Sequence, residues 1–182
     1  MNKMLVSMLM LTGVIVAQNP KVYVDMSQSW MKYDSNGIDD DFKPKASKWT
    51  VGYELKDFSF LSVALEGSAM LGFASDKKAV VHKNSGGTFT NAEVTLDKMY
   101  GLHLKGMFPL TETLNANVYV GASRARVRST SDQSRSNSSL ENSFSYGAGL
   151  EYWFPANVSL YANYMQYFKN LDAIEFGVGF RF

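Results

Sequence analysis

The last ten residues of the chain alternate strictly between large apolar side chains and small or charged ones. The apolar members are Ile174, Phe176, Val178, Phe180 and Phe182, and the residues between them are Ala173, Glu175, Gly177, Gly179 and Arg181. A period of two is typical of a β-strand whose two faces meet different surroundings. In a soluble sheet the apolar face would cover a core, whereas in a membrane barrel it would contact lipid and the polar face would line the lumen. The end of the chain therefore predicts a sheet protein with one wholly apolar face.

Seven further segments show the same alternation. They are Lys21–Tyr33, Ser47–Lys56, Leu61–Ala74, Asp97–Phe108, Leu114–Val127, Phe144–Phe154 and Asn157–Phe168. The connections alternate between long and short ones, as expected when turns are tight on one side of a membrane and loops are long on the other. After the N-terminus there is no apolar run of about 20 residues, so no transmembrane helix is expected. We therefore predict an all-β fold, an eight-stranded antiparallel up-and-down transmembrane β-barrel.

Three connections are long enough to serve as external loops, namely Asp34–Ala46, Ser75–Leu96 and Ser129–Ser143. In the second, Asn84-Ser85-Gly86-Gly87 predicts a hairpin tip between Ala79–Lys83 and Thr88–Glu93. The sheet would then extend above the membrane at this hairpin. The third connection is rich in Ser and Asn and predicts a mobile loop.

The N-terminal segment Met1–Ala17 has the pattern of a secretory signal peptide. Lys3 supplies the positive charge, Met4–Val16 the apolar stretch, and Ala17 a small residue for cleavage. A membrane anchor is the alternative, but the run is short for one. We therefore predict a signal peptide over residues 1–17 and an outer-membrane β-barrel domain over residues 18–182.

Cysteine is absent from the sequence, which excludes lipid attachment through a thiol, disulfides and cysteine-zinc sites. Removal of Lys3 with the leader leaves equal numbers of basic and acidic residues. A chain of balanced charge has no global signature of nucleic-acid binding, so we expect no nucleic-acid partner.

The segment Gly149-Leu-Glu-Tyr-Trp-Phe-Pro-Ala-Asn-Val-Ser-Leu-Tyr-Ala-Asn-Tyr164 resembles the last hairpin of small outer-membrane β-barrels. That family includes the OmpA transmembrane domain, OmpX, the attachment-invasion proteins and the opacity-type proteins. With the leader and the terminal Phe182, the resemblance covers essentially the whole chain. It implies a monomer in the outer membrane of a Gram-negative bacterium, in contact with outer-membrane lipid and lipopolysaccharide. It also implies that the closing strand, through Phe176, Val178, Phe180 and Phe182, is the signal for the barrel assembly machinery.

Eight polar residues share the inward parity of their strands and are predicted to form a polar network in the lumen. They are Asp25, Glu54, Glu66, His103, Lys105, Glu151, Glu175 and Arg181. Side chains fill the interior of an eight-stranded barrel, and a buried charge without a partner is very costly. We therefore expect Glu54, Glu66 and Glu151 to lie near Lys105 or Arg181, forming a structural plug. A gated proton or ion path is the alternative, and an arginine turned inward would balance the acidic excess.

A stripe of Arg124, Arg126 and Arg128 shares the outward parity of Leu114–Val127. An arginine at the bilayer midplane costs roughly 2–4 kcal/mol, and the cost falls toward zero at the interface. The stripe is therefore expected at or above the outer interface. There it could contact lipopolysaccharide phosphates together with Lys77 and Lys78. A solvated rim is one alternative, and a bulge that turns the arginines inward is another.

No catalytic, metal or cofactor site is expected from the sequence. Of the two histidines, His82 and His103, neither is followed two residues later by the outward serine that a lipid deacylase of this type would use. The acidic stretch from Asp34 to Asp41 lacks the closing glutamate of a calcium loop. We expect a non-enzymatic outer-membrane protein whose loops mediate adhesion, binding of host or envelope components, and envelope integrity. A narrow porin-like channel for small solutes is the alternative.

Overall fold

The computed structural model describes residues 22–34, 41–58, 60–81, 89–131 and 134–182. Within these ranges, side chains are described except at positions 78–81, 89–92, 129–131 and 134–141. None of the described residues belongs to a helix long and apolar enough to cross a membrane. The predicted signal peptide at residues 1–17, and the histidine at position 82, lie outside the described part.

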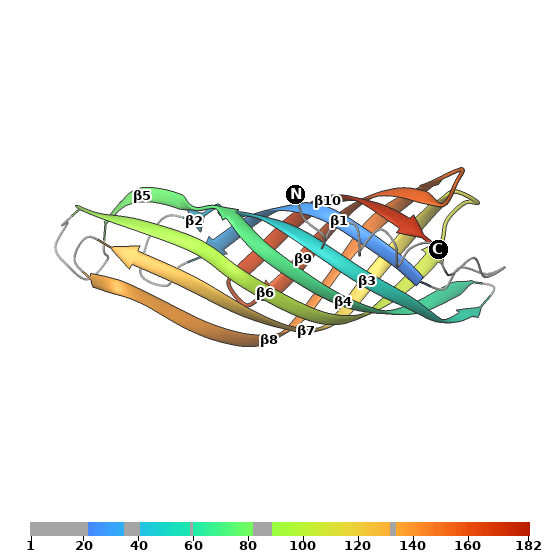
Figure 1. Ribbon diagram of the computed structural model, residues 1–182, viewed down its shortest axis with the longest axis horizontal. Coiled ribbons are helices and arrows are strands. Elements are labelled where there is room, and N and C mark those ends of the chain that lie inside the picture. The colour runs from blue at the N-terminus through green and yellow to red at the C-terminus, as the bar shows by residue number, and fades with distance from the viewer. Residues whose placement is uncertain (1–21, 35–40, 59, 82–88, 132–133) are drawn as a thin grey trace, which may run out of the picture.

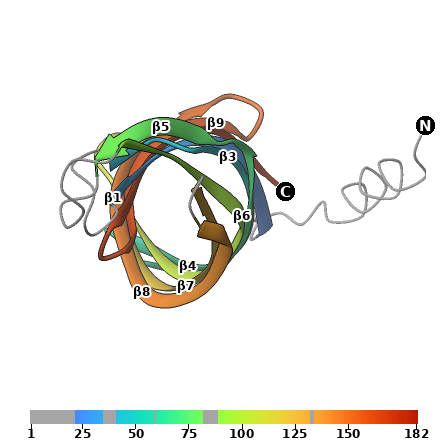
Figure 2. The same ribbon diagram turned by 90° about the vertical axis from the view of Figure 1, so that its left-hand side faces the viewer.

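The chain forms one antiparallel sheet that closes on itself. Its strands are β1 (Val22–Asp34), β2 (Asp41–Phe42), β3 (Lys45–Phe58), β4 (Leu61–Ala74), β5 (Asp76–Val81), β6 (Phe89–Pro109), β7 (Leu114–Ser131), β8 (Ser134–Phe154), β9 (Val158–Phe168) and β10 (Leu171–Arg181). Around the wall the strands pair in the order β1, β3, β4, β6, β7, β8, β9 and β10, and β10 returns to pair with β1 along Tyr23–Tyr33. Figure 1 shows the tilted strands from the side, and Figure 2 shows the closed ring from one end.

Two of the ten strands are continuations of others, so the wall itself has eight strands. β2 pairs with β1 beyond the start of β3, and β5 pairs with β6 beyond the end of β4. Where β2 and β5 face each other, the backbone amide of Lys43 donates to the Asp76 carboxylate at 2.7 Å. The predicted eight-stranded antiparallel barrel is confirmed.

The strands extend much further at one end of the barrel, the far end, than at the other, the near end. At the near end, where the chain enters and leaves the barrel, the Phe182 amide donates to the Val22 carbonyl at 2.8 Å. The turns at this end are tight, and Ala156 and Asn157 take positive φ values of 73° and 60° between β8 and β9. At the far end β5, β6, β7 and β8 project well beyond the rest of the wall (Figure 1).

The long connections contain more strand than the sequence indicated. The prediction of a mobile loop at Ser129–Ser143 is wrong, because β7 runs to Ser131 and β8 begins at Ser134. The loop expected at Asp34–Ala46 is shortened by β2 and by the start of β3. The hairpin predicted within Ser75–Leu96 is present as the β5–β6 pair, with its tip outside the described residues. The far end is therefore an extended sheet.

Candidate functional site

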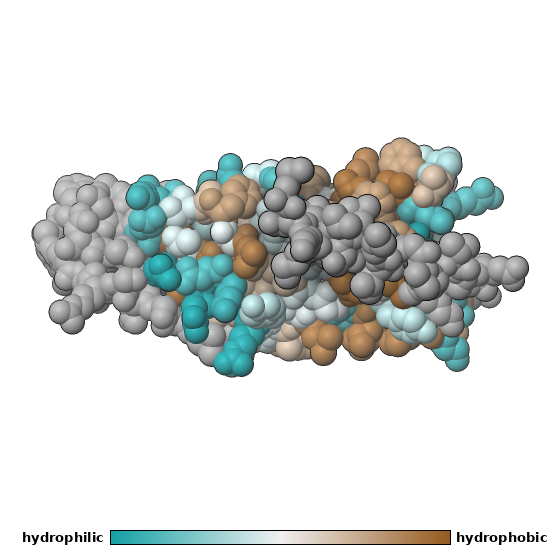
Figure 3. Space-filling model, viewed as in Figure 1, coloured by the Kyte–Doolittle hydropathy of each residue, from teal (hydrophilic) through white to brown (hydrophobic). Residues whose placement is uncertain are grey.

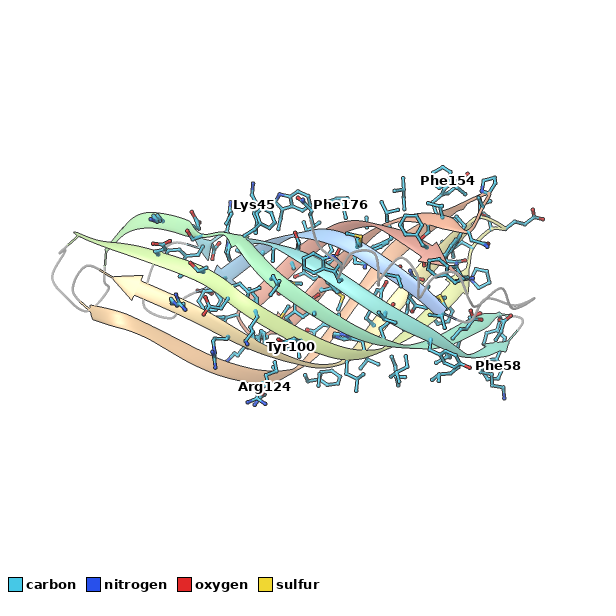
Figure 4. All side chains as sticks on the ribbon, viewed as in Figure 1. Lys45, Phe58, Tyr100, Arg124, Phe154 and Phe176 are labelled. Carbon is cyan, nitrogen blue, oxygen red and sulfur yellow. The ribbon has the colours of Figure 1, made fainter. Side chains whose placement is uncertain are left out.

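The outer wall carries a broad apolar band. Its exposed side chains include Val51, Leu65, Leu102, Val118, Val120, Leu150, Leu160 and Ile174. In Figure 3 the apolar colour gathers on the near half of the visible face, and hydrophilic colour predominates among the described residues toward the far end. Aromatic residues lie toward both limits of the band, with Phe58 and Phe154 near one end and Tyr100 and Phe176 toward the other (Figure 4). This arrangement is that of a wall surrounded by lipid.

Lys105 is the centre of a polar network inside the near half of the barrel. Its ammonium lies 3.1 Å from Glu151 and 3.6 Å from Glu66. Tyr23 donates to Glu66 at 2.7 Å, and Asn117 and Ser159 donate to Glu151 at 3.1 and 2.8 Å. All of these side chains are almost fully buried. Because both carboxylates are paired and hydrogen-bonded, their burial is tolerated.

A second network, around Lys48, was missed by the sequence analysis. The Lys48 ammonium lies 2.9 Å from Glu175, which is fully buried, and 3.0 Å from the Tyr167 hydroxyl. Tyr167 and Ser29 both donate to the other oxygen of Glu175. Lys48 shares the inward parity of Thr50, so the alternation of β3 contained the signal. This lysine reduces the acidic excess that had suggested an inward arginine, and it neutralises Glu175.

Besides His103, three residues of the predicted lumen network take no part in the hydrogen bonds and ion pairs around Lys105 and Lys48. Arg181 was expected to pair with a glutamate, but its guanidinium stacks on the Trp153 ring at 4.2 Å. Glu54 is partly exposed beside a bulge in β3 and joins neither network among the described residues. Asp25 is buried, and a Cβ built on Gly179 would lie 2.6 Å from its carboxylate. The prediction that Glu54 and Arg181 take part in the ion pairs of the lumen is therefore wrong.

Two inward glycines make room for tyrosine rings that fill the lumen. A Cβ built on Gly52 would lie 2.0 Å from the ring of Tyr23, its register partner on β1. A Cβ on Gly177 would lie 2.4 Å from the ring of Tyr161, its partner on β9. Each tyrosine side chain therefore crosses over a glycine of the next strand and occupies the interior.

His103 belongs to a small hydroxyl cluster on the interior side of β6, β7 and β8. Its Nε2 lies 2.8 Å from Ser145, and Ser145 lies 3.0 Å from Ser123. His103 is 2% exposed and Ser145 is fully buried, so a substrate carbonyl has no access to this pair. Within the described residues, no three acidic, His or Cys side chains gather as a metal site.

The interior of the far half is apolar. Its buried side chains include Met31, Phe42, Met70, Val94, Leu96, Met99, Ala125, Val127, Met165, Phe168, Leu171 and Ala173. These residues form one contiguous core that follows directly on the Lys48 network, since Tyr167 belongs to both. Among the described side chains, the polar networks and this core together occupy the interior from Tyr23 at the near end to Val94 and Val127 at the far end.

The arginine stripe points away from the interior. Arg124, Arg126 and Arg128 are exposed, while Ala125 and Val127 between them are buried. The alternative of a bulge that turns them inward is thus wrong. Arg128 forms an ion pair with Asp97 at 3.0 Å. Lys98, which the sequence analysis did not include, is the register partner of Arg126.

Ionisable groups at the far end form exposed cross-strand pairs. Lys77 lies 3.2 Å from Glu93, its register partner, and the side chain of Lys78 is outside the described set. A hydrogen bond from Ser75 lowers the pKa of Glu93, and the neighbouring Lys77 lowers it further by a smaller amount. Lys32 lies 3.0 Å from Asp41, and this hydrogen bond raises the pKa of Lys32.

Together, an apolar outer band, aromatic rows and a polar interior define an integral membrane β-barrel with a filled lumen. The sequence matches the model of the outer membrane protein beta-barrel domain over residues 4–182, so the chain belongs to this family. It is an integral protein of the outer membrane, and the far end of the barrel is the external end.

Solved structures show the same fold. Ail, the attachment invasion locus protein of Yersinia pestis, superimposes with a TM-score of 0.59 at 19% identity, covering 91% of this chain and 100% of Ail. A second Ail structure, in complex with the heparin analogue sucrose octasulfate, gives 0.50 at 21% identity, covering 89% and 97%. The N-terminal barrel of Pseudomonas aeruginosa OprF gives 0.54 at 18% identity, covering 90% and 100%. The comparison with curated proteins finds no match.

Proposed function

We propose that this chain is a non-enzymatic surface-interaction protein whose external sheet binds a partner outside the cell. The observation that carries the proposal is the free edge of β8 at the far end. β9 pairs with β8 only from Tyr146 toward the near end, yet β8 continues outward to Ser134. No other described strand pairs with that side of β8 between Ser134 and Ser145. An unpaired edge of this kind is a template for an added strand.

The direction of the backbone amides identifies which residues of β8 present their N–H groups at the free edge. The Trp153 amide donates to Thr113 on the β7 side. Amides alternate in direction along a strand, so odd-numbered residues of β8 face β7 and even-numbered residues face the open side. Ser138 is even-numbered and is the register partner of Arg128. Its amide is therefore on the open edge.

The filled interior argues against the alternative of a narrow channel. Conduction would require Lys105 to separate from Glu66 and Glu151 inside the barrel. That separation would leave buried charges unpaired. The resemblance to Ail, an attachment protein that is also known in complex with a heparin analogue, favours a partner at the external surface. The chain is proposed to act as a monomer, since closure leaves no free edge within the lipid band.

The experiment compares adhesion of bacteria that display the native chain with bacteria that display Ser138→Pro or Ser138→Ala. Proline removes the outward amide and is tolerated at an edge, while alanine keeps it. We expect Ser138→Pro to lose retention on an immobilised basement-membrane extract and Ser138→Ala to retain it. Equal retention of all three would reject the edge as the binding surface. Single-channel steps in planar bilayers would favour the channel instead.

Envelope assembly is a second part of the proposal. Phe176 and Phe180 on β10 face the lipid, Val178 is partly exposed on the same face, and Phe182 ends the chain beside Val22. We propose that this row is read by the barrel assembly machinery. Deletion of Phe182 should reduce the folded protein in the outer membrane while leaving refolding in detergent unchanged. Normal levels in the membrane would contradict the proposal.

A further inference from the structure

Three cations gather around one aromatic residue on the outer face of β6 and β7. Lys98 is the register partner of Arg126, and Tyr100 is the register partner of Arg124. Like charges directly opposite each other on adjoining strands destabilise a sheet. Lys98, Arg124 and Arg126 are all exposed, and none has an acidic partner among the described side chains. The barrel therefore maintains a repulsive arrangement that a bound anion would neutralise.

The neighbouring Arg128 differs from Arg124 and Arg126 because it has an acidic partner. It lies on the same face of β7, two residues further out, and is held at 3.0 Å by Asp97. Asp97 is available because a bulge interrupts the β6 register between Leu96 and Lys98. Of the two lysines predicted for the rim, Lys77 is paired with Glu93. Among the described cations of the stripe and of β6 beside it, Lys98, Arg124 and Arg126 are thus the ones without an acidic partner.

The cluster lies where the lipid band ends. Ala122 is the last small apolar residue on the outward face of β7, and Arg124 follows it on that face. Tyr100 is 52% exposed and belongs to the aromatic residues at the external limit of the band. Figure 4 shows Arg124 beyond Tyr100 toward the far end. Lipid phosphates lie at this depth, since acyl chains end at the aromatic girdle.

Two surface recesses meet at Tyr100 and Arg124. One, of about 260 Å³, is lined by Lys98, Tyr100, Arg124, Ala125 and Arg126. The other is shallow, with a volume of about 520 Å³, and extends from the same two residues to Leu102 and Ala122 in the apolar band, with Asn142 and Ser143 on its β8 side. A cationic recess that continues into an apolar one fits an amphiphile with a phosphate head. A soluble anion would use only the first recess.

We propose that Lys98, Arg124 and Arg126, with Tyr100, bind a phosphate on the headgroup of an outer-leaflet glycolipid of the lipopolysaccharide class. Arg124 joins the two recesses and presents a guanidinium, which binds phosphate through two parallel hydrogen bonds. Arg128 is not part of the site. This site is on the wall of the barrel and is independent of the partner proposed for the free edge of β8.

The test uses the whole chain, folded in zwitterionic detergent, with lipid A as the probe. The triple variant Lys98→Gln/Arg124→Gln/Arg126→Gln is compared with Arg128→Gln as the matched control. We expect the triple variant to lose affinity about tenfold or more, since it lacks the charge-assisted hydrogen bonds to the phosphate. Arg128→Gln should remain within about twofold of the native chain. Heat-modifiable gel migration checks that each variant is folded.

A second arm varies the ligand against the unchanged protein. Dephosphorylated lipid A should bind as weakly to the native chain as lipid A does to the triple variant. Inorganic phosphate at millimolar concentration should fail to displace lipid A. The proposal is overturned if the triple variant binds like the native chain, if Arg128→Gln weakens binding equally, or if inorganic phosphate competes fully, which would indicate a soluble anion.

Discussion

The membrane half and the external half of this barrel have opposite polarity. In the membrane half the interior is polar, with the Lys105 and Lys48 networks, and the exterior is apolar. In the external half the interior is an apolar core around Met70, Leu96 and Met165, and the exterior carries charges. The same continuous strands form both halves. The surroundings, and not the strand geometry, therefore decide which face is apolar.

β7 shows the reversal within one strand. From Asn117 to Ser123 the inward residues are polar or small and the outward ones, such as Val118 and Val120, are apolar. From Arg124 the outward residues are charged, and the inward Ala125 and Val127 are apolar. The change of polarity between Ser123 and Arg124 thus marks the level at which lipid gives way to water.

The two interiors should respond differently to loss of a side chain, and the largest effect is expected in the membrane half. Lys105→Met leaves Glu66 and Glu151 buried without their cation, which should lower the free energy of unfolding by about 3–5 kcal/mol. Lys45→Met is the matched control, because Lys45 is exposed on β3 and should change stability by less than about 0.5 kcal/mol. Urea unfolding in phospholipid vesicles measures both. Equal effects would mean that the Lys105 network contributes little.

The outer surfaces of the two halves are compared by two substitutions on the outward face of β7, one that places a charge in the lipid band and one that removes a charge outside it. Val118→Arg places a charge in the lipid band and should cost about 2–4 kcal/mol. Arg126→Val, eight residues further out on the same face, should change stability by no more than about 0.5 kcal/mol. The unfolding measurement is made without glycolipid, so that binding at Arg126 does not contribute. A similar cost at both positions would contradict the assigned membrane boundary.

The external core should be a separate, weaker unit of stability. Leu96→Ala removes a side chain that is 2% exposed and should cost about 2 kcal/mol, at the low end for such changes. The value is low because only the external end needs to open when this core is weakened. Amide hydrogen exchange should accelerate in β5 and the outer parts of β6 and β7, and remain slow around Lys105. Uniform acceleration over the whole barrel would show that the halves unfold together.

Most of the wall could be predicted from the sequence because a period of two is a local property. The same alternation contained Lys48, which shares a face with Thr50. The error at Ser129–Ser143 arose because polar composition was given more weight than periodicity. Ala125 and Val127 continue the alternation past the point where its polarity reverses, and that reversal indicates a strand that leaves the membrane.

The pairing of the interior charges could not be read from the sequence. Lys105 on β6 meets Glu151 on β8, with β7 between them, and Lys48 on β3 meets Glu175 on β10, with β1 between them. Such contacts depend on the stagger between strands and on how side chains cross the lumen. Strand parity shows that a residue faces inward but not which residue it meets. Arg181 illustrates this, since it faces inward and stacks on Trp153.

The smallest expected effect concerns the exposed pairs of the external half, which differ from the buried pairs in their response to pH. The pKa of Glu93 is lowered by Ser75 and Lys77, so its ionised form stabilises the β5–β6 hairpin. This contribution is present above the unfolded pKa of about 4.3 and is lost as the pH falls through the lower folded pKa. Hydrogen exchange of β5, corrected for intrinsic rates, should therefore accelerate slightly on acidification below about pH 4. Glu93→Gln should remove this dependence, whereas Glu112→Gln in the near-end turn should keep it. A Glu93→Gln hairpin that still loosens with acid would assign the effect to another group.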